Sequence, residues 1–210
     1  MLRIITNMKR CVKSAIDAAL CPIKTWLICL PWRVRKGRNV KFQGKTYLRT
    51  YSGGTISIGD NVVFNSISRQ NLAGLMGPTI VCAADGAKIE IGDSCGFSAT
   101  VINSKRQIRI GRYVNIGANT KIFDHDFHSL LWNERRPPEN KQNVRSRPVV
   151  ICDDVFIGAN VIILKGTKIG ARSIVAAGSV VFGLDVPPDS MVKGNPAVIT
   201  TTSKSNCSLS

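Results

Sequence analysis

Branched aliphatic residues recur at every sixth position between residues 151 and 181. An amphipathic helix repeats its apolar positions about every 3.6 residues and a half-buried strand about every two, so neither alone explains this spacing. A period of six fits a coil in which each hexapeptide forms one flat side and then turns a corner. Glycine follows the aliphatic position at Gly158 and Gly170, where a corner favours a residue without Cβ. The aliphatic positions are Ile151, Ile157, Ile163, Ile169, Val175 and Val181.

A longer unit shows that the repeat begins well upstream. It reads ISIGDNVVF at 56–64, IEIGDSCGF at 89–97, IRIGRYVNI at 108–116 and VVICDDVFI at 149–157. The copies start 33, 19 and 41 residues apart, whereas three hexapeptides make a turn of about 18 residues. The long steps therefore predict an irregular loop within 65–80 and an insertion near 123–147. The pattern as a whole predicts an all-β fold, a parallel β-helix of hexapeptide repeats over residues 50–186.

The two ends of the repeat carry different signals. Pro187 and Pro188 cannot donate ladder hydrogen bonds, so we expect a C-terminal cap and a polar, disordered tail over residues 187–210. Residues 1–49 have apolar positions consistent with helices, and we expect a short basic, partly helical segment before the coil. Caps are needed because each turn of a solenoid pairs only with its neighbours.

Composition constrains the core and the compartment. The 210 residues are 44% hydrophobic but only 6% aromatic, which predicts an aliphatic core. The seven cysteines are scattered without a CxxC motif, and their odd number favours reduced thiols in a cytoplasmic protein.

Positive charge is concentrated at the N-terminus. The formal net charge is +16, and residues 1–49 hold 12 Lys and Arg against a single acid. The apolar run TWLICLPW at 25–32 is too short to span a bilayer and lacks the features of a signal peptide. Two interpretations stay open: peripheral contact of residues 1–38 with an anionic membrane through Trp26, Trp32 and the basic groups, or a helical cap over the first coil. No nucleic-acid-binding module accompanies the charge, so we expect no nucleic acid as partner.

The two histidines of the chain lie together in FDHDFHS, residues 123–129, at the start of the predicted insertion. Histidine is the side chain best suited to accept a proton near neutral pH. Asp124 and Asp126 flank His125, and either a carboxylate or a backbone carbonyl could orient its ring. His125 is therefore a candidate general base, although a histidine in a loop can also be merely exposed.

Residues from about 50 to 199 resemble the hexapeptide-repeat O-acetyltransferases of the maltose, galactoside and nodulation-factor type. They resemble still more the branch that modifies bacterial surface polysaccharides. The resemblance implies a left-handed coil, unlike the usual right-handed crossover, and a homotrimer with active sites between subunits. It also implies acetyl-CoA as acyl donor and no metal. The matching pieces are IGANTKIFDHDFHS, an arginine-containing loop, VFIGANVIILKGTKIGARSIVAAGSVV and PPDSMVKGNPAVI.

Carried over by position, the resemblance implies roles for single residues. His125 would take the proton of the acceptor hydroxyl, and a backbone N–H near Ala159 would stabilise the oxyanion. Ser98, Asp126 and His128 would contact the acceptor, although Ser98 could be a corner residue and His128 simply exposed. The acetyl-CoA groove would be formed by Phe156, Gly158, Ala159, Ala176, Ala177, Gly178 and Lys193.

The groove assignment has an alternative. Small residues let pantetheine approach the backbone, but the corners of a coil also require small residues. Lys193 could meet a CoA phosphate or remain solvated. Phe182-Gly183 and Val198 stand where many relatives have Thr-Lys and Arg, which puts the contacts to the CoA phosphates in question.

Together with the resemblance, these residues lead to the hypothesis that the protein acetylates a sugar hydroxyl on a surface polysaccharide or lipid-linked glycan precursor, at the inner face of the cytoplasmic membrane. A catalytically silent β-helix scaffold would show the same repeat but has no need of the DHDFH string. A γ-type carbonic anhydrase needs three histidine ligands, and serine O-acetylation a larger N-terminal helical domain. Residues 1–49 do not match the sugar-binding lobe of the small-sugar enzymes, which argues against a free disaccharide as acceptor.

Overall fold

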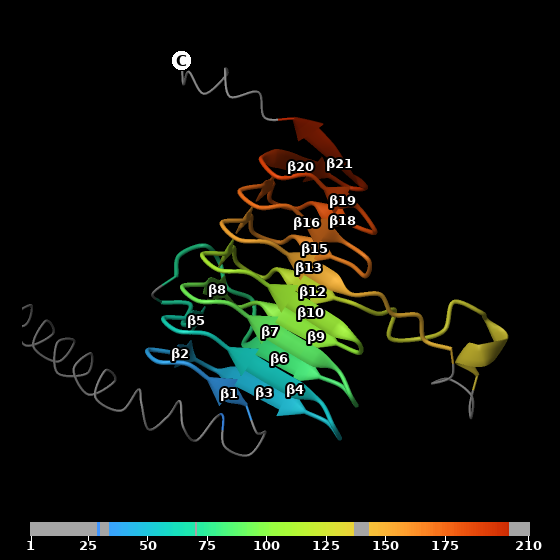
Figure 1. Cartoon of the computed structure of the whole chain (residues 1–210), viewed down its shortest axis with the longest axis horizontal. Helices are drawn as coiled ribbons and strands as arrows, with labels where there is room; N and C mark the ends of the chain where they lie inside the picture. Colours follow the sequence, from blue (N-terminus) through green and yellow to red (C-terminus); the bar gives the residue numbers. More distant parts are fainter. Residues whose placement is uncertain (1–28, 30–33, 70, 137–142, 202–210) are drawn as a thin grey trace, which may run out of the picture.

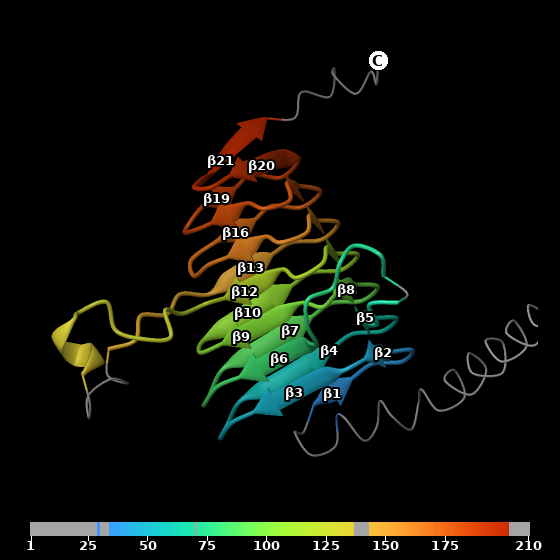
Figure 2. The same ribbon diagram turned by 180° about the vertical axis from the view of Figure 1, so that it is seen from behind.

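The computed structural model describes residues 29, 34–69, 71–136 and 143–201. Its strands form three sheets along the three sides of one coil (Figure 1, Figure 2). The first sheet contains β1 (Arg35–Lys36), β4 (Thr55–Ile58), β7 (Lys88–Ile91), β10 (Gln107–Ile110), β13 (Val149–Ile151), β16 (Lys168–Ile169) and β19 (Asp185–Val186). The second contains β2 (Lys41–Gly44), β5 (Val63–Ser66), β8 (Gly96–Ser98), β11 (Asn115–Ile116), β14 (Phe156–Ile157), β17 (Ile174–Val175), β20 (Ser190–Gly194) and β21 (Ala197–Thr201). The third contains β3 (Thr46–Thr50), β6 (Thr79–Ala83), β9 (Val101–Ser104), β12 (Lys121–Phe123), β15 (Ile162–Ile163) and β18 (Val180–Val181).

The predicted sixfold period is confirmed as the inward position of the coil. Each of the six aliphatic residues from Ile151 to Val181 is 1% exposed or less. Parallel register stacks every third one, so Val175 lies next to Ile157 in the second sheet. Among the described strands only β20 and β21 pair antiparallel. Parallel sheets on three sides are consistent with a left-handed β-helix.

The coil is longer than the sequence indicated. β1, β2 and β3 lie inside the 1–49 range that we predicted to precede it, and the buried Val192 extends the core beyond residue 186. The helices predicted in residues 1–28 lie outside the described residues. In the described part of the chain, no helix is long and apolar enough to cross a membrane.

The core is aromatic near its N-terminal end, where composition predicted only aliphatic residues. Phe42, Phe64 and Phe97 stack in successive coils, with ring centroids 5.0 and 4.7 Å apart. These three rings occupy the inward position of the second sheet, which aliphatic residues hold in the later coils. Three of the chain's few aromatic side chains are thus stacked in one column of the core.

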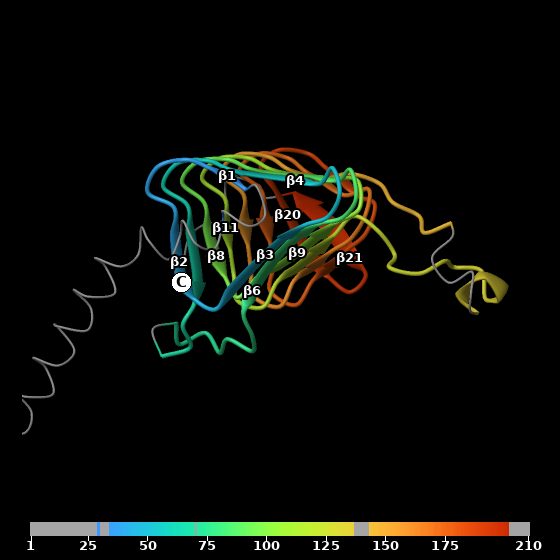
Figure 3. The same ribbon diagram turned by 90° about the horizontal axis from the view of Figure 1, so that it is seen from below.

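Two sets of corners matter for function. The small-residue corner joins the second and third sheets and consists of 99–100, 117–120, 158–161 and 176–179. The insertion corner joins the third sheet to the first sheet of the next coil and consists of 105–106, 124–148, 164–167 and 182–184. The two predicted excursions are present, the loop 67–78 between β5 and β6 and the insertion 124–148 between β12 and β13. They leave the coil on different sides (Figure 3).

Candidate functional site

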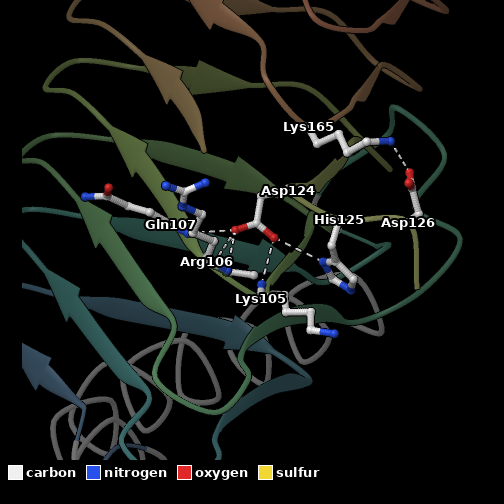
Figure 4. A network of polar contacts seen from close by, with 8 residues as sticks. Lys105, Arg106, Gln107, Asp124, His125, Asp126 and Lys165 are labelled. Carbon is white, nitrogen blue, oxygen red and sulfur yellow. Dashed lines mark hydrogen bonds and ion pairs between the residues drawn. The ribbon is translucent and has the colours of Figure 1, made fainter. Parts of the chain in front are cut away.

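The insertion begins with a fully buried carboxylate. β12 ends at Phe123, and the side chain of Asp124, 0% exposed, turns toward the preceding coil at residues 104–107. One carboxylate oxygen accepts hydrogen bonds from Ser104 Oγ (2.7 Å) and from two backbone N–H groups, those of Arg106 (2.8 Å) and Gln107 (2.7 Å). The other accepts the backbone N–H of Lys105 at 2.7 Å. The corner of one coil therefore anchors the insertion of the next (Figure 4).

His125 is held by that carboxylate. Its Nδ1 lies 3.0 Å from Asp124 Oδ1, and the residue is only 9% exposed. Burial alone would raise the pKa of Asp124, but the hydrogen bonds from His125, Lys105, Ser104 and Arg106 outweigh it and hold the pKa below its ordinary value. An ionised carboxylate only accepts hydrogen bonds, so Nδ1 carries the hydrogen of a neutral His125 ring. Its Nε2 is then the basic nitrogen.

A second contact fixes the chain just after His125. Lys165 Nζ donates a short hydrogen bond to Asp126 Oδ1, and Lys165 is 8% exposed although it lies on a corner. The Lys165 ammonium also lies 4.9 Å from the centre of the Phe182 ring. The Phe127 ring packs against His125 with centroids 4.3 Å apart. The Asp126 carboxylate is therefore held by Lys165, and the His125 ring contacts Phe127.

The other residues predicted beside His125 have different surroundings. Asp126 Oδ1 accepts the hydrogen bond from Lys165, while its Oδ2 is buried without a hydrogen-bond partner among the described residues. The side chain of His128 is exposed. Ser98 is far from this corner, because it ends β8 in the second sheet.

Ser98 and Phe156 share a hollow on the second sheet. They line an open depression of about 310 Å³ together with Gly117 and Asn115, and Phe156 is 51% exposed. Asn71 from the loop 67–78 donates a hydrogen bond to Ser98 Oγ at 2.9 Å. The same loop is tied to the small-residue corner, because Asn119 Nδ2 donates to Gly74 O at 2.9 Å.

The predicted groove residues all lie at or beside the small-residue corner. A Cβ added to Gly158 would lie 2.5 Å from the Ala177 nitrogen of the next coil, so this glycine is required by coil stacking. Gly178 has a φ of +73° and open space around its missing Cβ, so it is favoured by backbone conformation instead. Ala177 is exposed, and no backbone hydrogen bond among the described residues uses the Ala159 N–H.

Lys193 is exposed and adjoins the same corner, since the next residue, Gly194, donates its N–H to Ser179 Oγ at 3.2 Å. One chain thus brings Phe156, Ser98, Lys193 and the small residues to one side of the coil. It places His125 with Asp126 and His128 on another. The two halves of the predicted site do not meet within a single chain.

Sequence reasoning missed two of the residues that hold the segment around His125. Asp124 was considered only as one of two possible carboxylate partners, and Lys165 was not considered at all. A lysine just after an inward aliphatic residue, as in Ile163-Leu-Lys, was the available signal. In the described ranges no group of three or more His, Cys, Asp or Glu could hold a metal ion.

Comparison with protein families identifies the type of repeat. Residues 148–183 match the bacterial transferase hexapeptide family, in its six-repeat form. A 2,3,4,5-tetrahydropyridine-2,6-dicarboxylate N-acetyltransferase of Clostridium perfringens is 60% identical over 52 residues, which is 25% of this chain and 22% of that protein. YvoF of Bacillus subtilis, which carries the name of an acetyltransferase, is 36% identical over 118 residues, 55% of this chain and 61% of YvoF. The chain therefore spans about a fifth to three fifths of these relatives.

Solved structures share the fold over most of the chain. AntD, an N-acyltransferase from Bacillus cereus in complex with dTDP and 3-hydroxybutyryl-CoA, superposes with a TM-score of 0.64 at 23% identity, covering 85% of this chain and 87% of AntD. The polySia-specific acetyltransferase NeuO superposes with a TM-score of 0.53 at 20% identity, covering 84% and 87%. At these identities the likeness shows the shared β-helix.

Proposed function

We propose that this protein transfers an acetyl group from acetyl-CoA to a sugar hydroxyl of a surface polysaccharide or lipid-linked glycan precursor. The observation that carries the proposal is the pair of His125 and Asp124, a nearly buried imidazole whose Nδ1 is held by an ionised carboxylate. This arrangement is suited to general base catalysis, because it fixes the tautomer and stabilises the imidazolium that forms. The relatives named as acetyltransferases and N-acyltransferases support acyl transfer, and the CoA in the AntD complexes supports a CoA thioester as donor.

The residues take the following roles. His125 Nε2 accepts the proton of the acceptor hydroxyl while that oxygen attacks the thioester carbonyl. The tetrahedral oxyanion accepts a hydrogen bond from the Ala159 N–H. Collapse of this intermediate breaks the carbon–sulfur bond, and the imidazolium returns its proton to the CoA thiolate. Phe156 provides an apolar wall for pantetheine, and the small corner from Ala176 to Gly178 lets it lie close to the backbone.

The complete site requires a second copy of the chain. His125 and the small-residue corner lie on different sides of one coil, so a neighbouring subunit must supply the missing half. A homotrimer, in which each subunit presents its insertion corner to the small-residue corner of the next, supplies three such sites. Peripheral contact of residues 1–38 with anionic lipid would place the sites at the membrane. Truncation before Cys29 should then weaken binding to anionic liposomes and leave the coil intact.

The test is release of thiol from acetyl-CoA in the presence of surface-glycan precursors. His125→Ala should lower turnover by about 10²–10⁴-fold while CoA binding and oligomeric mass persist. His128→Ala is the matched control and should retain most of the activity. Substantial turnover in His125→Ala would remove His125 as the base. An absence of both thiol release with any acceptor and CoA binding would favour the scaffold function.

A further inference from the structure

Four basic residues surround the segment that carries His125. Lys105 and Arg106 form the turn of the preceding coil and donate their backbone N–H groups to the Asp124 carboxylate. Arg147, on the returning limb of the insertion, donates its backbone N–H to the Asp124 carbonyl at 2.9 Å. The Arg145 carbonyl accepts the Asp126 N–H at 3.2 Å, so all four are joined directly to residues flanking His125.

Lys105, Arg106 and Arg145 have no charged or aromatic side-chain partner among the described residues, whereas the Arg147 guanidinium lies 5.9 Å from the centre of the Phe182 ring. All four are exposed, and none forms a salt bridge with a residue in the described ranges. The two acids that flank His125 already have partners, because Asp124 accepts backbone and Ser104 hydrogen bonds and Asp126 pairs with Lys165. Asp85, on the same corner one coil earlier, is exposed and pairs with none of the four. The surface around His125 therefore has a net positive charge.

The position of these residues separates them from the proposed donor groove. The groove residues of the small-residue corner follow β14 and β17, one and two coils after the coil that ends in His125. Lys105 and Arg106 follow β9, one coil before it. In Figure 4 the Lys105 side chain extends to the same side of Asp124 as His125. An acceptor that reaches His125 from the side opposite the donor would meet Lys105 and Arg106 first.

We propose that the acceptor is an anionic glycan, with a carboxylate or phosphate on or next to the sugar that is acetylated, and that Lys105, Arg106 and Arg145 bind this anion. The assignment of the sugar as acceptor rests on the function proposed above, whereas anion binding at this corner does not. Lysine and arginine bind carboxylate and phosphate by charge-assisted hydrogen bonds, and a neutral sugar would leave Lys105, Arg106 and Arg145 without charged partners. Binding between exposed charges weakens with salt, because the screening length falls to about 8 Å at physiological ionic strength.

Anion binding by the Lys105 and Arg106 side chains can be tested separately from the support that their backbone gives to His125. Lys105 and Arg106 hold Asp124 through backbone N–H groups, which remain when the side chains are changed. Lys105→Gln and Arg106→Gln therefore remove the cations and preserve the Asp124–His125 contact. Lys41→Gln is the matched control, because Lys41 is an exposed lysine in β2, in the second sheet.

The experiment measures binding of size-matched oligosaccharides of glucuronate, of sialic acid and of neutral glucose to the full-length protein by titration calorimetry, without acetyl-CoA. An acidic oligomer should bind more tightly than the neutral one, and its affinity should fall as salt rises from 20 to 200 mM. The double variant Lys105→Gln/Arg106→Gln should weaken acidic binding by about 5- to 20-fold, whereas Lys41→Gln should leave it unchanged. Equal binding of neutral and acidic oligomers, or no effect of the double variant, would overturn the proposal.

Steady-state kinetics distinguish the acceptor anion from the phosphates of CoA. The double variant should raise KM for the acidic acceptor and leave KM for acetyl-CoA unchanged. A raised KM for acetyl-CoA alone would assign the cations to the donor and contradict an anionic acceptor. Absence of turnover with every acceptor would count against the proposed acetyl transfer, while the binding titration would still decide whether this corner binds an acidic glycan.

Discussion

Asp124 accepts hydrogen bonds from five donors at a position with no solvent exposure. A buried charge is stabilised only when its oxygens are fully hydrogen-bonded, and here three of the donors are backbone N–H groups of one turn. The same carboxylate therefore closes the corner of the preceding coil and orients His125. Stability and catalysis depend on one side chain at this point.

Asp124→Asn should weaken both properties. The amide cannot accept all of these hydrogen bonds, and its NH₂ group would face N–H donors, so the free energy of unfolding at pH 7 should fall by about 1–3 kcal/mol. With its ring less well oriented, His125 should give a kcat lower by about 10- to 100-fold. Urea denaturation and thiol release measure the two effects.

The difference in unfolding free energy between the wild type and Asp124→Asn should depend on pH. The folded-state pKa of Asp124 is lowered, so its stabilising contribution is complete above the unfolded-state value of about 3.9 and is lost as pH falls through the folded value. The gap in unfolding free energy between the wild type and Asp124→Asn should therefore be constant above about pH 5 and shrink below pH 4. A gap that stays constant down to pH 3 would contradict the assignment.

The glycines of the small-residue corner are predicted to respond differently to alanine. In Gly158→Ala the new Cβ would lie 2.5 Å from backbone of the next coil, so the coils must separate, at a cost of about 1–3 kcal/mol. In Gly178→Ala the Cβ meets open space, and only the left-handed backbone opposes it, at about 1 kcal/mol. Thermal unfolding should show the larger loss for Gly158→Ala. The reverse order would show that coil spacing is not the constraint at Gly158.

At the scale of elements, the insertion is attached to the coil mainly at its first residues. Asp126 reaches Lys165 of a later corner, and His125 forms an isolated β-bridge with Ser146 on the returning limb. Beyond these contacts the insertion extends away from the coil, and the exposed Trp132 lies at its far part beside η2 (Asn133–Arg135). The position of His125 therefore depends on contacts at the base of the insertion.

Lys165→Met should loosen the attachment of the insertion to the coil without disturbing the coil itself. Methionine keeps the volume of the stem, but the Asp126 carboxylate then loses its only described side-chain partner and is left as a partly buried charge. We expect amide hydrogen exchange of residues 124–136 to accelerate by about 10-fold or more, while β15 and β16 stay protected. Lys168→Met is the control, because its ion pair with Asp185 spans 3.5 Å between largely exposed side chains. Equal effects of the two variants would refute a clamp at Lys165.

Strands could be predicted from the sequence where the hexapeptide repeat is complete, and they were missed where it is not. β13 to β18 could be predicted because each inward position is covered by coils on both sides and must be apolar, and in these coils it is always aliphatic. The first coil was missed because Lys36 occupies the position that Ile58 holds one coil later. No described coil lies below it, so that position has no need to be apolar. Asp126 and Lys165 are 39 residues apart, and no local pattern signals a contact over that separation.

At the scale of the whole molecule, the coil fixes the distance between its corners. His125 and the groove residues were predicted on separate stretches of sequence, but period six gives no information on which corner of a neighbour each would face. That relation depends on association between chains. The two half-sites therefore make subunit assembly a condition for activity in the proposed mechanism.

Subunit mixing tests this condition. His125→Ala removes the base, and Ala177→Trp fills the exposed small-residue corner, so each variant alone should be inactive. When the two are mixed by co-refolding, about a quarter of the interfaces in a random cyclic trimer join two intact halves, and turnover should recover to roughly that fraction. Light scattering confirms the oligomeric mass, and Lys41→Gln mixed with His125→Ala should retain about half of the activity, because every groove is intact and half of the interfaces keep His125. Failure of mixed oligomers to recover activity would place the whole site in one chain.

The antiparallel pairing of β21 with β20 limits the length of the coil. Every earlier strand of the second sheet pairs with a parallel successor, so an uncovered β20 would offer free N–H and C=O groups to the first coil of another molecule. A strand that runs the other way occupies this edge and breaks the register that a further turn would need. Chains cut after Gly194 should therefore polymerise end to end into fibrils, and the last hairpin is what keeps a self-templating stack at a finite size.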